Sequence, residues 1–210
     1  YFSDSYFTTE RFDTSRITID RGEFFKEWNP DARGEYKRHL ITNTGISPRL
    51  VPGAVGGFVT TDSDEHTEDG RITEVAEVRM ANVRKRLKKF ELLRNEVEPP
   101  YVYGPAEAET VLIGWGSTYG PLKEATEILL DQGRKVRMMH FSEIWPFPAQ
   151  LVIEELRKAK LMVSVESNAT GQMAHLIRAE TSIEIGAKIL RFDGRPMTPS
   201  YIVQEFEKVR

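Results

Sequence analysis

Two short polar stretches in the C-terminal half carry the side chains whose types and spacing could bind a ligand. In the first, Gly116, Ser117 and Thr118 directly follow the apolar residues 111–115. Backbone N–H groups at such a strand-to-helix junction can hold an anion. The stretch lacks the lysine and second glycine of a P-loop and is not a GxGxxG motif. The alternative, which the sequence favours, is a tight turn that packs a helix onto a sheet.

The second polar stretch follows the unbroken apolar residues 161–165. Glu166, Asn168 and Gln172 could form hydrogen bonds with a ligand or a facing subunit. Asn is equally suited to capping the next helix, and Gly171 supplies the backbone freedom of the turn. Both interpretations stay open. The candidate cofactor contacts from the two stretches are Gly116, Ser117, Thr118, Asn168, Gly171 and Gln172.

Other residues with chemical potential form no recognisable site. The acidic residues within 62–69 could invite a divalent cation, but no Glu stands where an EF-hand loop requires it. We predict a polar turn there and no metal site. The histidines are scattered, and no nucleophile-elbow signature is present. We expect His175 to be a partly buried core or interface side chain, and the sequence contains no complete active site.

Composition restricts the class of protein. The 210 residues are 40% hydrophobic and 29% charged, with a net charge of −3, as in a soluble globular protein that does not bind nucleic acid. The absence of Cys excludes disulfides and thiolate ligands to a metal or iron–sulfur cluster from this sequence. No apolar run is long enough to cross a membrane, and the expected location is cytoplasmic.

The elements that would position the two polar stretches alternate between strand and helix. Thr198 as N-cap and Pro199 at the first helical position mark the start of the last helix. The order predicts an α/β fold: a mainly parallel open sheet with helices on both faces. Its predicted strands are residues 111–115, 135–141, 161–165 and 187–192.

The N-terminal half has a different character. Residues 21–73 are rich in Gly, Pro, Asp, Asn and Thr, and their aromatic residues favour an ordered arm lying on another domain or subunit over a disordered segment. Within it, Arg49 stands between Pro48 and Pro52, and we predict an inter-domain or inter-subunit contact for this loop. Pro and Gly residues at 99–105 predict a stiff linker.

Residues 74–94 read as a helix with an apolar seam that packs on a partner surface. The seam consists of Ala76, Met80, Val83, Leu87 and Phe90. Basic residues crowd the other faces, namely Arg84, Lys85, Arg86, Lys88 and Lys89. They form either a docking face for an acidic partner or phosphate group, or a solvated surface, which charge runs of this kind favour. The sequence begins Tyr-Phe-Ser-Asp without Met, which we interpret as a piece of a longer subunit.

Several motifs together resemble the alpha subunits of 2-oxoacid:ferredoxin oxidoreductases, most closely the 2-oxoglutarate (KorA-type) branch. They are GISPRLVPG (45–53), DSDEHTEDGRIT (62–73), GWGSTYGPLKEA (114–125), HFSEIWPFP (140–148), ESNATGQMAHLIR (166–178) and FDGRPMTP (192–199). The family's pyrimidine-binding thiamine diphosphate domain is missing. The resemblance implies three parts: a tail of that domain at 1–20, a linking arm at 21–106, and a domain like the transketolase C-terminal domain at 107–210.

The resemblance also implies an activity and partners. In the complete complex, thiamine diphosphate, Mg²⁺ and a [4Fe–4S] cluster would be held mainly outside this chain. Its partners would be a beta subunit, the N-terminal part of its own alpha subunit, and, through the complex, ferredoxin and coenzyme A. This chain would contribute no catalytic residue and would be inactive alone. Coenzyme A would contact the basic helix or the Ser117 turn.

Two alternative hypotheses assign this sequence to other kinds of protein. A flavodoxin-like module could bind a nucleotide or flavin at the two junctions without catalysis, but the sequence lacks a phosphate loop. The matching domain of another thiamine enzyme, such as a pyruvate dehydrogenase E1 beta chain, would lack the GISPRLVPG arm at residues 45–53.

Overall fold

The computed structural model describes residues 15, 18, 35–54 and 57–209. These fall into two compact units, one that ends at Glu96 and one that begins at Val97. The predicted division into residues 1–20, 21–106 and 107–210 stays a prediction, and its first part lies almost entirely outside the described residues.

The C-terminal unit is built on a five-stranded sheet in the order β1-β3-β2-β4-β5. Four strands are parallel neighbours, and β1 pairs antiparallel with β3 at one edge. The predicted α/β class with a mainly parallel sheet is therefore confirmed. The strands are β1 (Tyr101–Tyr103), β2 (Thr110–Trp115), β3 (Val136–Phe141), β4 (Leu161–Glu166) and β5 (Ala187–Leu190).

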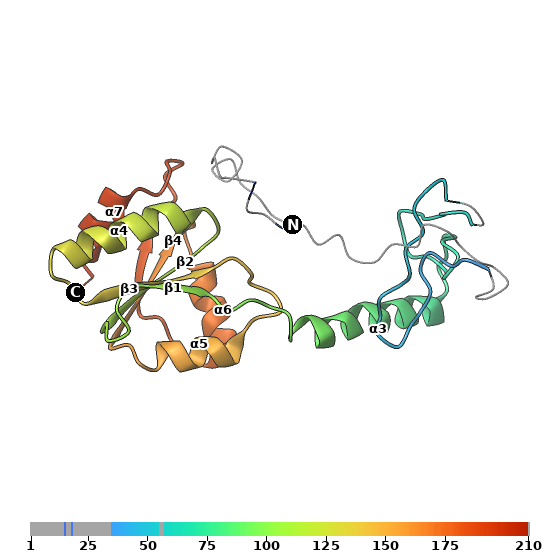
Figure 1. Ribbon diagram of the computed structural model, residues 1–210, viewed down its shortest axis with the longest axis horizontal. Coiled ribbons are helices and arrows are strands. Elements are labelled where there is room, and N and C mark those ends of the chain that lie inside the picture. Colours follow the sequence, from blue (N-terminus) through green and yellow to red (C-terminus); the bar gives the residue numbers. More distant parts are fainter. Residues whose placement is uncertain (1–14, 16–17, 19–34, 55–56, 210) are drawn as a thin grey trace. The chain divides into compact units, whose positions relative to one another are not determined.

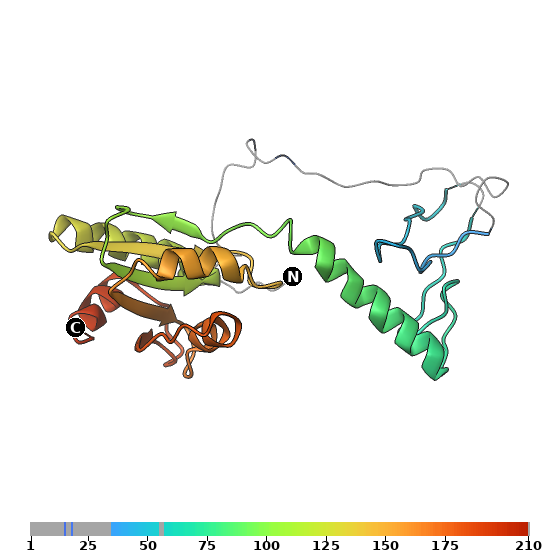
Figure 2. The ribbon, with the colours of Figure 1, turned by 90° about the horizontal axis from the view of Figure 1, so that it is seen from below.

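Helices cover both faces of this sheet, as the sequence predicted. Figure 1 shows α4 (Tyr119–Asp131) and α7 (Pro199–Phe206) on one face, and α5 (Ala149–Leu156) and α6 (Gln172–Thr181) on the other. The view from below in Figure 2 has α5 in front of the strands. Thr198 is the N-cap of α7, as predicted, and its side chain accepts a hydrogen bond from Tyr201 N. In the described residues, no helix combines the length and apolarity needed to cross a membrane.

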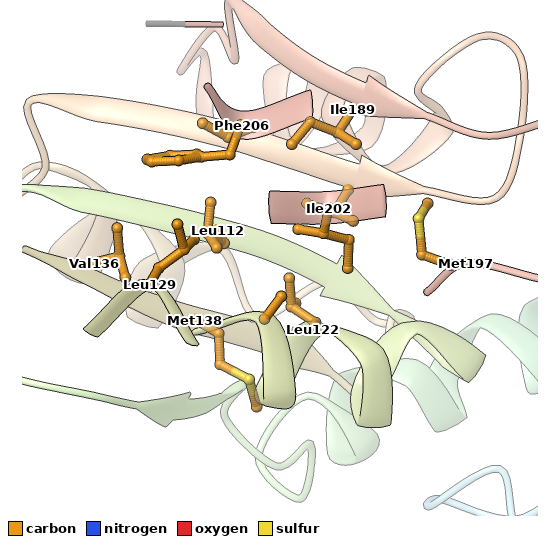
Figure 3. Packing of buried hydrophobic residues seen from close by; sticks show 12 residues of the cluster. Leu112, Leu122, Leu129, Val136, Met138, Ile189, Met197, Ile202 and Phe206 are labelled. Carbon is orange, nitrogen blue, oxygen red and sulfur yellow. The ribbon is translucent and has the colours of Figure 1, made fainter. Parts of the chain in front are cut away.

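The two hydrophobic cores follow from the period of two along the strands. Leu112 faces α4 and α7, whereas its neighbours Val111 and Ile113 face α5 and α6. In the first core, Leu112 and Leu122 lie close to Ile202 of α7 (Figure 3). Both faces are covered, so most strand positions carry apolar residues, and the polar exceptions Arg137, His140, Ser164 and Glu166 are themselves buried. This explains why the strand sequences show no alternation.

Strand β1 was not expected. The Pro- and Gly-rich residues around it predicted a linker, yet Tyr101–Tyr103 pair with residues 138–140 of β3. Three residues are too few to show a period. The prolines flank the strand, and it occupies a sheet edge, where Pro is tolerated.

The N-terminal unit packs loops against helix α3 (Ala76–Leu93), and it does so through the helix's polar side. Asn82 and Lys85 are its buried residues, whereas Met80 is 48% and Leu87 is 59% exposed. Of the predicted seam, Ala76, Met80 and Leu87 are thus exposed in the described part of the chain, whereas Val83 and Phe90 are half-buried. The basic residues of α3 are not all on a solvated surface, because Lys85 donates hydrogen bonds to His39 O and Ser47 Oγ.

The acidic residues 62–69 form a polar turn rather than a cluster. Glu65 pairs with Arg79 and with Arg86, at 3.3 and 2.9 Å. The hydrogen bond from Arg86 is the main reason why the pKa of Glu65 is lowered to about 2. Glu68 pairs with Lys37 at 2.9 Å. Within the described ranges, no group of three His, Asp or Glu residues is arranged to hold a metal ion.

A pair of glycine substitutions tests the close approach of β2 and α4. A Cβ at Gly114 would lie 2.5 Å from Thr118 Oγ1 and 2.7 Å from Leu122 Cδ2, whereas a Cβ at Gly186 would meet nothing within 4 Å. We expect Gly114→Ala to lower the free energy of unfolding by about 1–3 kcal/mol, since overpacking displaces the helix. Gly186→Ala should change it by less than about 0.5 kcal/mol. Equal urea midpoints for the two variants would contradict this packing.

Candidate functional site at the strand carboxyl ends

The sheet order brings the two predicted junctions together. From β2 the chain passes to β3 on one side and later to β4 on the other, so β2 and β4 are neighbours with crossovers on opposite sides. Ligands of open α/β sheets bind at such a topological switch point, outside the carboxyl ends of the strands. The turn after β2 and the loop after β4 both start there.

The polar side chain of Thr118 in the turn after β2 forms hydrogen bonds with the backbone at the end of that strand. Thr118 Oγ1 accepts a hydrogen bond from Trp115 N at 2.9 Å and donates one to Trp115 O at 2.8 Å. Gly116 has a φ of +59°, a backbone conformation that favours glycine. Ser117 is half-buried, and no hydrogen bond of its side chain is found among the described residues.

The carbonyl group of Gly116 accepts a hydrogen bond from His140, a residue that was not predicted as part of the site. His140 Nε2 lies 3.0 Å from Gly116 O and donates to it, and the imidazole packs edge-on against the Tyr119 ring at 5.2 Å. Burial lowers the pKa of His140 to about 4, so the imidazole is neutral at pH 7. His140 is the fifth residue of a strand buried on both faces, and that position was the available signal.

Glu166 is the centre of the site. Its carboxylate is fully buried and accepts hydrogen bonds from five donors. These are Ser164 Oγ at 2.5 Å, Asn168 Nδ2 at 2.8 Å, Met173 N at 2.9 Å, Ala174 N at 3.2 Å and Trp115 Nε1 at 3.2 Å. Burial by itself would raise the pKa of this carboxyl group. The hydrogen bonds, with that from Ser164 the largest, outweigh burial and lower the pKa below the ordinary value.

The loop between β4 and α6 is closed by Asn168. Its Oδ1 accepts from Gly171 N at 2.7 Å and from Thr170 N at 3.1 Å, while its Nδ2 donates to Glu166. These bonds close the loop before the helix but do not cap α6, whose N-cap is Gly171. The first-turn N–H groups of Met173 and Ala174 donate to Glu166 instead. Gly171 takes the left-handed conformation at φ +72° before α6. Gln172 is exposed, and the bonds of Asn168 leave Gln172 and Ser117 as the candidate side chains still open to a ligand.

The other predicted residues are His175 and the loop residues Pro48, Arg49 and Pro52. His175 is exposed on α6, beside the inward Ala174, so the core alternative of its prediction is wrong and the interface alternative stays a prediction. In the N-terminal unit, the loop with Pro48, Arg49 and Pro52 is anchored by Tyr36. The Tyr36 hydroxyl donates to Pro48 O at 3.3 Å and accepts from Leu50 N at 3.0 Å, which leaves the Arg49 side chain exposed.

Comparison with known proteins gives the family. Residues 108–202 match the model of the pyruvate:ferredoxin oxidoreductase core domain II. The chain is 36% identical over 191 residues to the alpha subunit of 2-oxoacid:ferredoxin oxidoreductase 2 of Aeropyrum pernix, covering 90% of this chain and 29% of that subunit. This chain belongs to the alpha subunits of the 2-oxoacid:ferredoxin oxidoreductases. It spans less than a third of the length of the Aeropyrum relative.

Two further relatives of this alpha-subunit chain carry more specific names. Over 90 residues it is 39% identical to the 2-oxoglutarate oxidoreductase subunit KorA of Mycobacterium tuberculosis, covering 43% of this chain and 13% of KorA. A solved structure of 2-oxoglutarate:ferredoxin oxidoreductase from Magnetococcus marinus, with 2-oxoglutarate, coenzyme A and succinyl-CoA bound, has a TM-score of 0.73. It is 30% identical, and the match covers 94% of this chain and 34% of that one.

Replacing the buried carboxylate tests whether Glu166 holds the switch point together. In Glu166→Gln an amide NH₂ would face some of the five donors, and we expect unfolding to become easier by roughly 2–4 kcal/mol. The lowered pKa of Glu166 means that its stabilisation is complete above its ordinary value of 4.5 and is lost as the pH falls through the lower folded-state value. The stability gap between wild type and variant should therefore narrow on acidification.

Gln172→Ala is the matched control, because this exposed side chain lies in the same loop region and should change stability by less than about 0.5 kcal/mol. Urea unfolding at pH 7 and at pH 3 measures both variants. A Glu166→Gln protein as stable as wild type at pH 7 would contradict the assigned role.

Proposed function

We propose that this chain serves, within a complete alpha subunit and its complex, the oxidative decarboxylation of a 2-oxoacid. In balanced form, a 2-oxoacid anion, coenzyme A and two oxidised ferredoxins give acyl-CoA, CO₂, one proton and two reduced ferredoxins. The C–C bond to the carboxylate breaks, the thioester bond forms, and two electrons leave to ferredoxin. Membership of the alpha-subunit family supports this proposal.

We infer that the substrate is 2-oxoglutarate. Two relatives support the choice, namely the KorA subunit and the Magnetococcus enzyme, both of which are named for 2-oxoglutarate. The Aeropyrum relative, which is 36% identical over 90% of this chain, carries only the broader 2-oxoacid name and supports the substrate class rather than 2-oxoglutarate itself.

The role that the geometry supports best for this part is scaffolding. The observation that carries it is the Glu166 carboxylate, which is buried and accepts five internal hydrogen bonds. A carboxylate held in this way positions secondary structure and does not exchange a proton with a substrate. His140 is likewise buried and bonded to Gly116 O. The exposed Arg49 and the open seam of α3 are the surfaces that would meet other parts of the complex.

The cofactors implied by the family do not fit this chain as their holder. The 210 residues contain no Cys, so thiolate ligands for a [4Fe–4S] cluster are absent from them. In the described part of the chain, acidic and histidine side chains form no metal-binding group. We therefore place thiamine diphosphate, Mg²⁺ and the cluster on other parts of the complex, chiefly the beta subunit, and assign no reaction step to this chain.

Reconstitution tests the proposal. The alpha subunit that contains this sequence, assembled with its beta subunit, should reduce ferredoxin in the presence of coenzyme A and 2-oxoglutarate, and more slowly with pyruvate. The isolated 210 residues should show no turnover. Activity with pyruvate alone would overturn the 2-oxoglutarate assignment. A thermal shift of several degrees with FMN, without any association with the beta subunit, would favour the flavodoxin-like module instead.

Removal of the Arg49 side chain tests the interface. Arg49→Ala should weaken association of alpha and beta subunits by about tenfold, as expected for the loss of one charge-assisted contact. Arg84→Ala is the matched control, because Arg84 is also an exposed arginine of the N-terminal unit. Analytical ultracentrifugation or surface plasmon resonance would measure both. Unchanged assembly of Arg49→Ala would remove the predicted contact.

A further inference from the structure

A cavity of about 250 Å³ in the N-terminal unit is lined by an unusual concentration of positive charge. Five of its ten lining residues are Lys or Arg, two are His, and none is acidic. The ten are Arg38, His39, Ile46, Ser47, Arg49, His66, Asn82, Lys85, Arg86 and Lys89.

These charges are poorly compensated. Arg86 pairs with Glu65 at 2.9 Å. Arg38, Arg49 and Lys89 form no ion pair with any carboxylate of the described residues. Buried Lys85 donates to His39 O at 2.7 Å and to Ser47 Oγ, which are both neutral acceptors.

The crowding has a measurable consequence at Lys85. Burial, followed by the repulsion of Lys89, Arg38 and Arg86, lowers the pKa of Lys85 to about 8, although Glu68 acts in the opposite direction. The neutral partners of Lys85 cannot offset this repulsion. An anion in the cavity would do so for several cations at once, because each of them lines the same space.

The size and donor set indicate which anion. A volume of about 250 Å³ lies just below the roughly 300–1,000 Å³ of pockets that enclose a whole drug-sized ligand, so the cavity suits one charged group. One guanidinium group can donate two parallel hydrogen bonds to two oxygens of a phosphate group. A cluster of several cations also matches a group with two or more negative charges better than a single carboxylate. Acidic peptides, whose negative charges are single and spaced along the chain, match this cluster of cations less well.

We propose that this basic cavity binds the phosphate or diphosphate group of a small ligand whose remainder lies outside it. The site is separate from the strand-end junctions and does not depend on the proposed activity. The group could belong to free phosphate or diphosphate, or to the phosphates of coenzyme A, and the two sources differ in what the rest of the ligand adds.

Calorimetric titration of the full chain in chloride buffer tests the proposal with phosphate, diphosphate, coenzyme A and acetate as probes. Diphosphate or coenzyme A should bind at least tenfold more tightly than acetate. The double variant Arg38→Gln/Lys89→Gln should weaken that binding by tenfold or more, since two charge-assisted contacts are lost. Lys85→Met, checked for folding by circular dichroism, should weaken it similarly.

The double variant Arg84→Gln/Lys88→Gln is the matched control. It removes the same charge from exposed positions of the N-terminal unit that do not line the cavity, and it should bind as wild type does. Equal binding of diphosphate and coenzyme A supports a free phosphate site, whereas binding of coenzyme A alone assigns the cavity to that ligand. Three results would overturn the proposal: no binding of any phosphate probe, equal losses in both double variants, or binding of an acidic beta-subunit peptide in place of the probes.

Discussion

The C-terminal unit depends on one buried carboxylate. Glu166 ends β4, and its five hydrogen bonds reach the side chain at the end of β2, the next loop and the first turn of α6. A buried negative charge is tolerated only when donors surround it, and here the donors come from segments that must be brought together. The same interaction therefore fixes the geometry of the switch point and uses the hydrogen-bonding capacity of the Glu166 carboxylate within the fold.

The N-terminal unit reverses the usual arrangement of an amphipathic helix. α3 turns Asn82 and Lys85 toward its loops and leaves Met80 and Leu87 exposed. The loops offer carbonyl, hydroxyl and carboxylate acceptors rather than an apolar surface, so the polar side of the helix is the one they can satisfy. The exposed seam is consistent with a chain that works inside a larger subunit. The basic cavity lies where this polar packing brings together five Lys or Arg side chains and no carboxylate.

Much of the C-terminal unit could be predicted because its signals are local. The four apolar strands, the Thr198 cap and the positions of the strand-to-helix junctions after β2 and β4 were predicted correctly from a few adjacent residues. β1 was missed because three residues between prolines carry no period. His140 was missed because its role is set by Gly116, 24 positions away. The role of Glu166 was left open, because helix capping and ligand binding require the same residue types at that position.

The sequence by itself determined the α/β class, the order of the elements from β2 onward and the family, since apolar runs, caps and motif order are properties of neighbouring residues. Only the tertiary structure decided that the two junctions meet, because adjacency of β2 and β4 is a matter of crossover connections that no local pattern encodes. It also decided which side of α3 is covered and where the basic side chains converge. Those outcomes depend on how distant segments satisfy one another's polar groups, and hydrogen-bonding needs of that kind are met only in three dimensions.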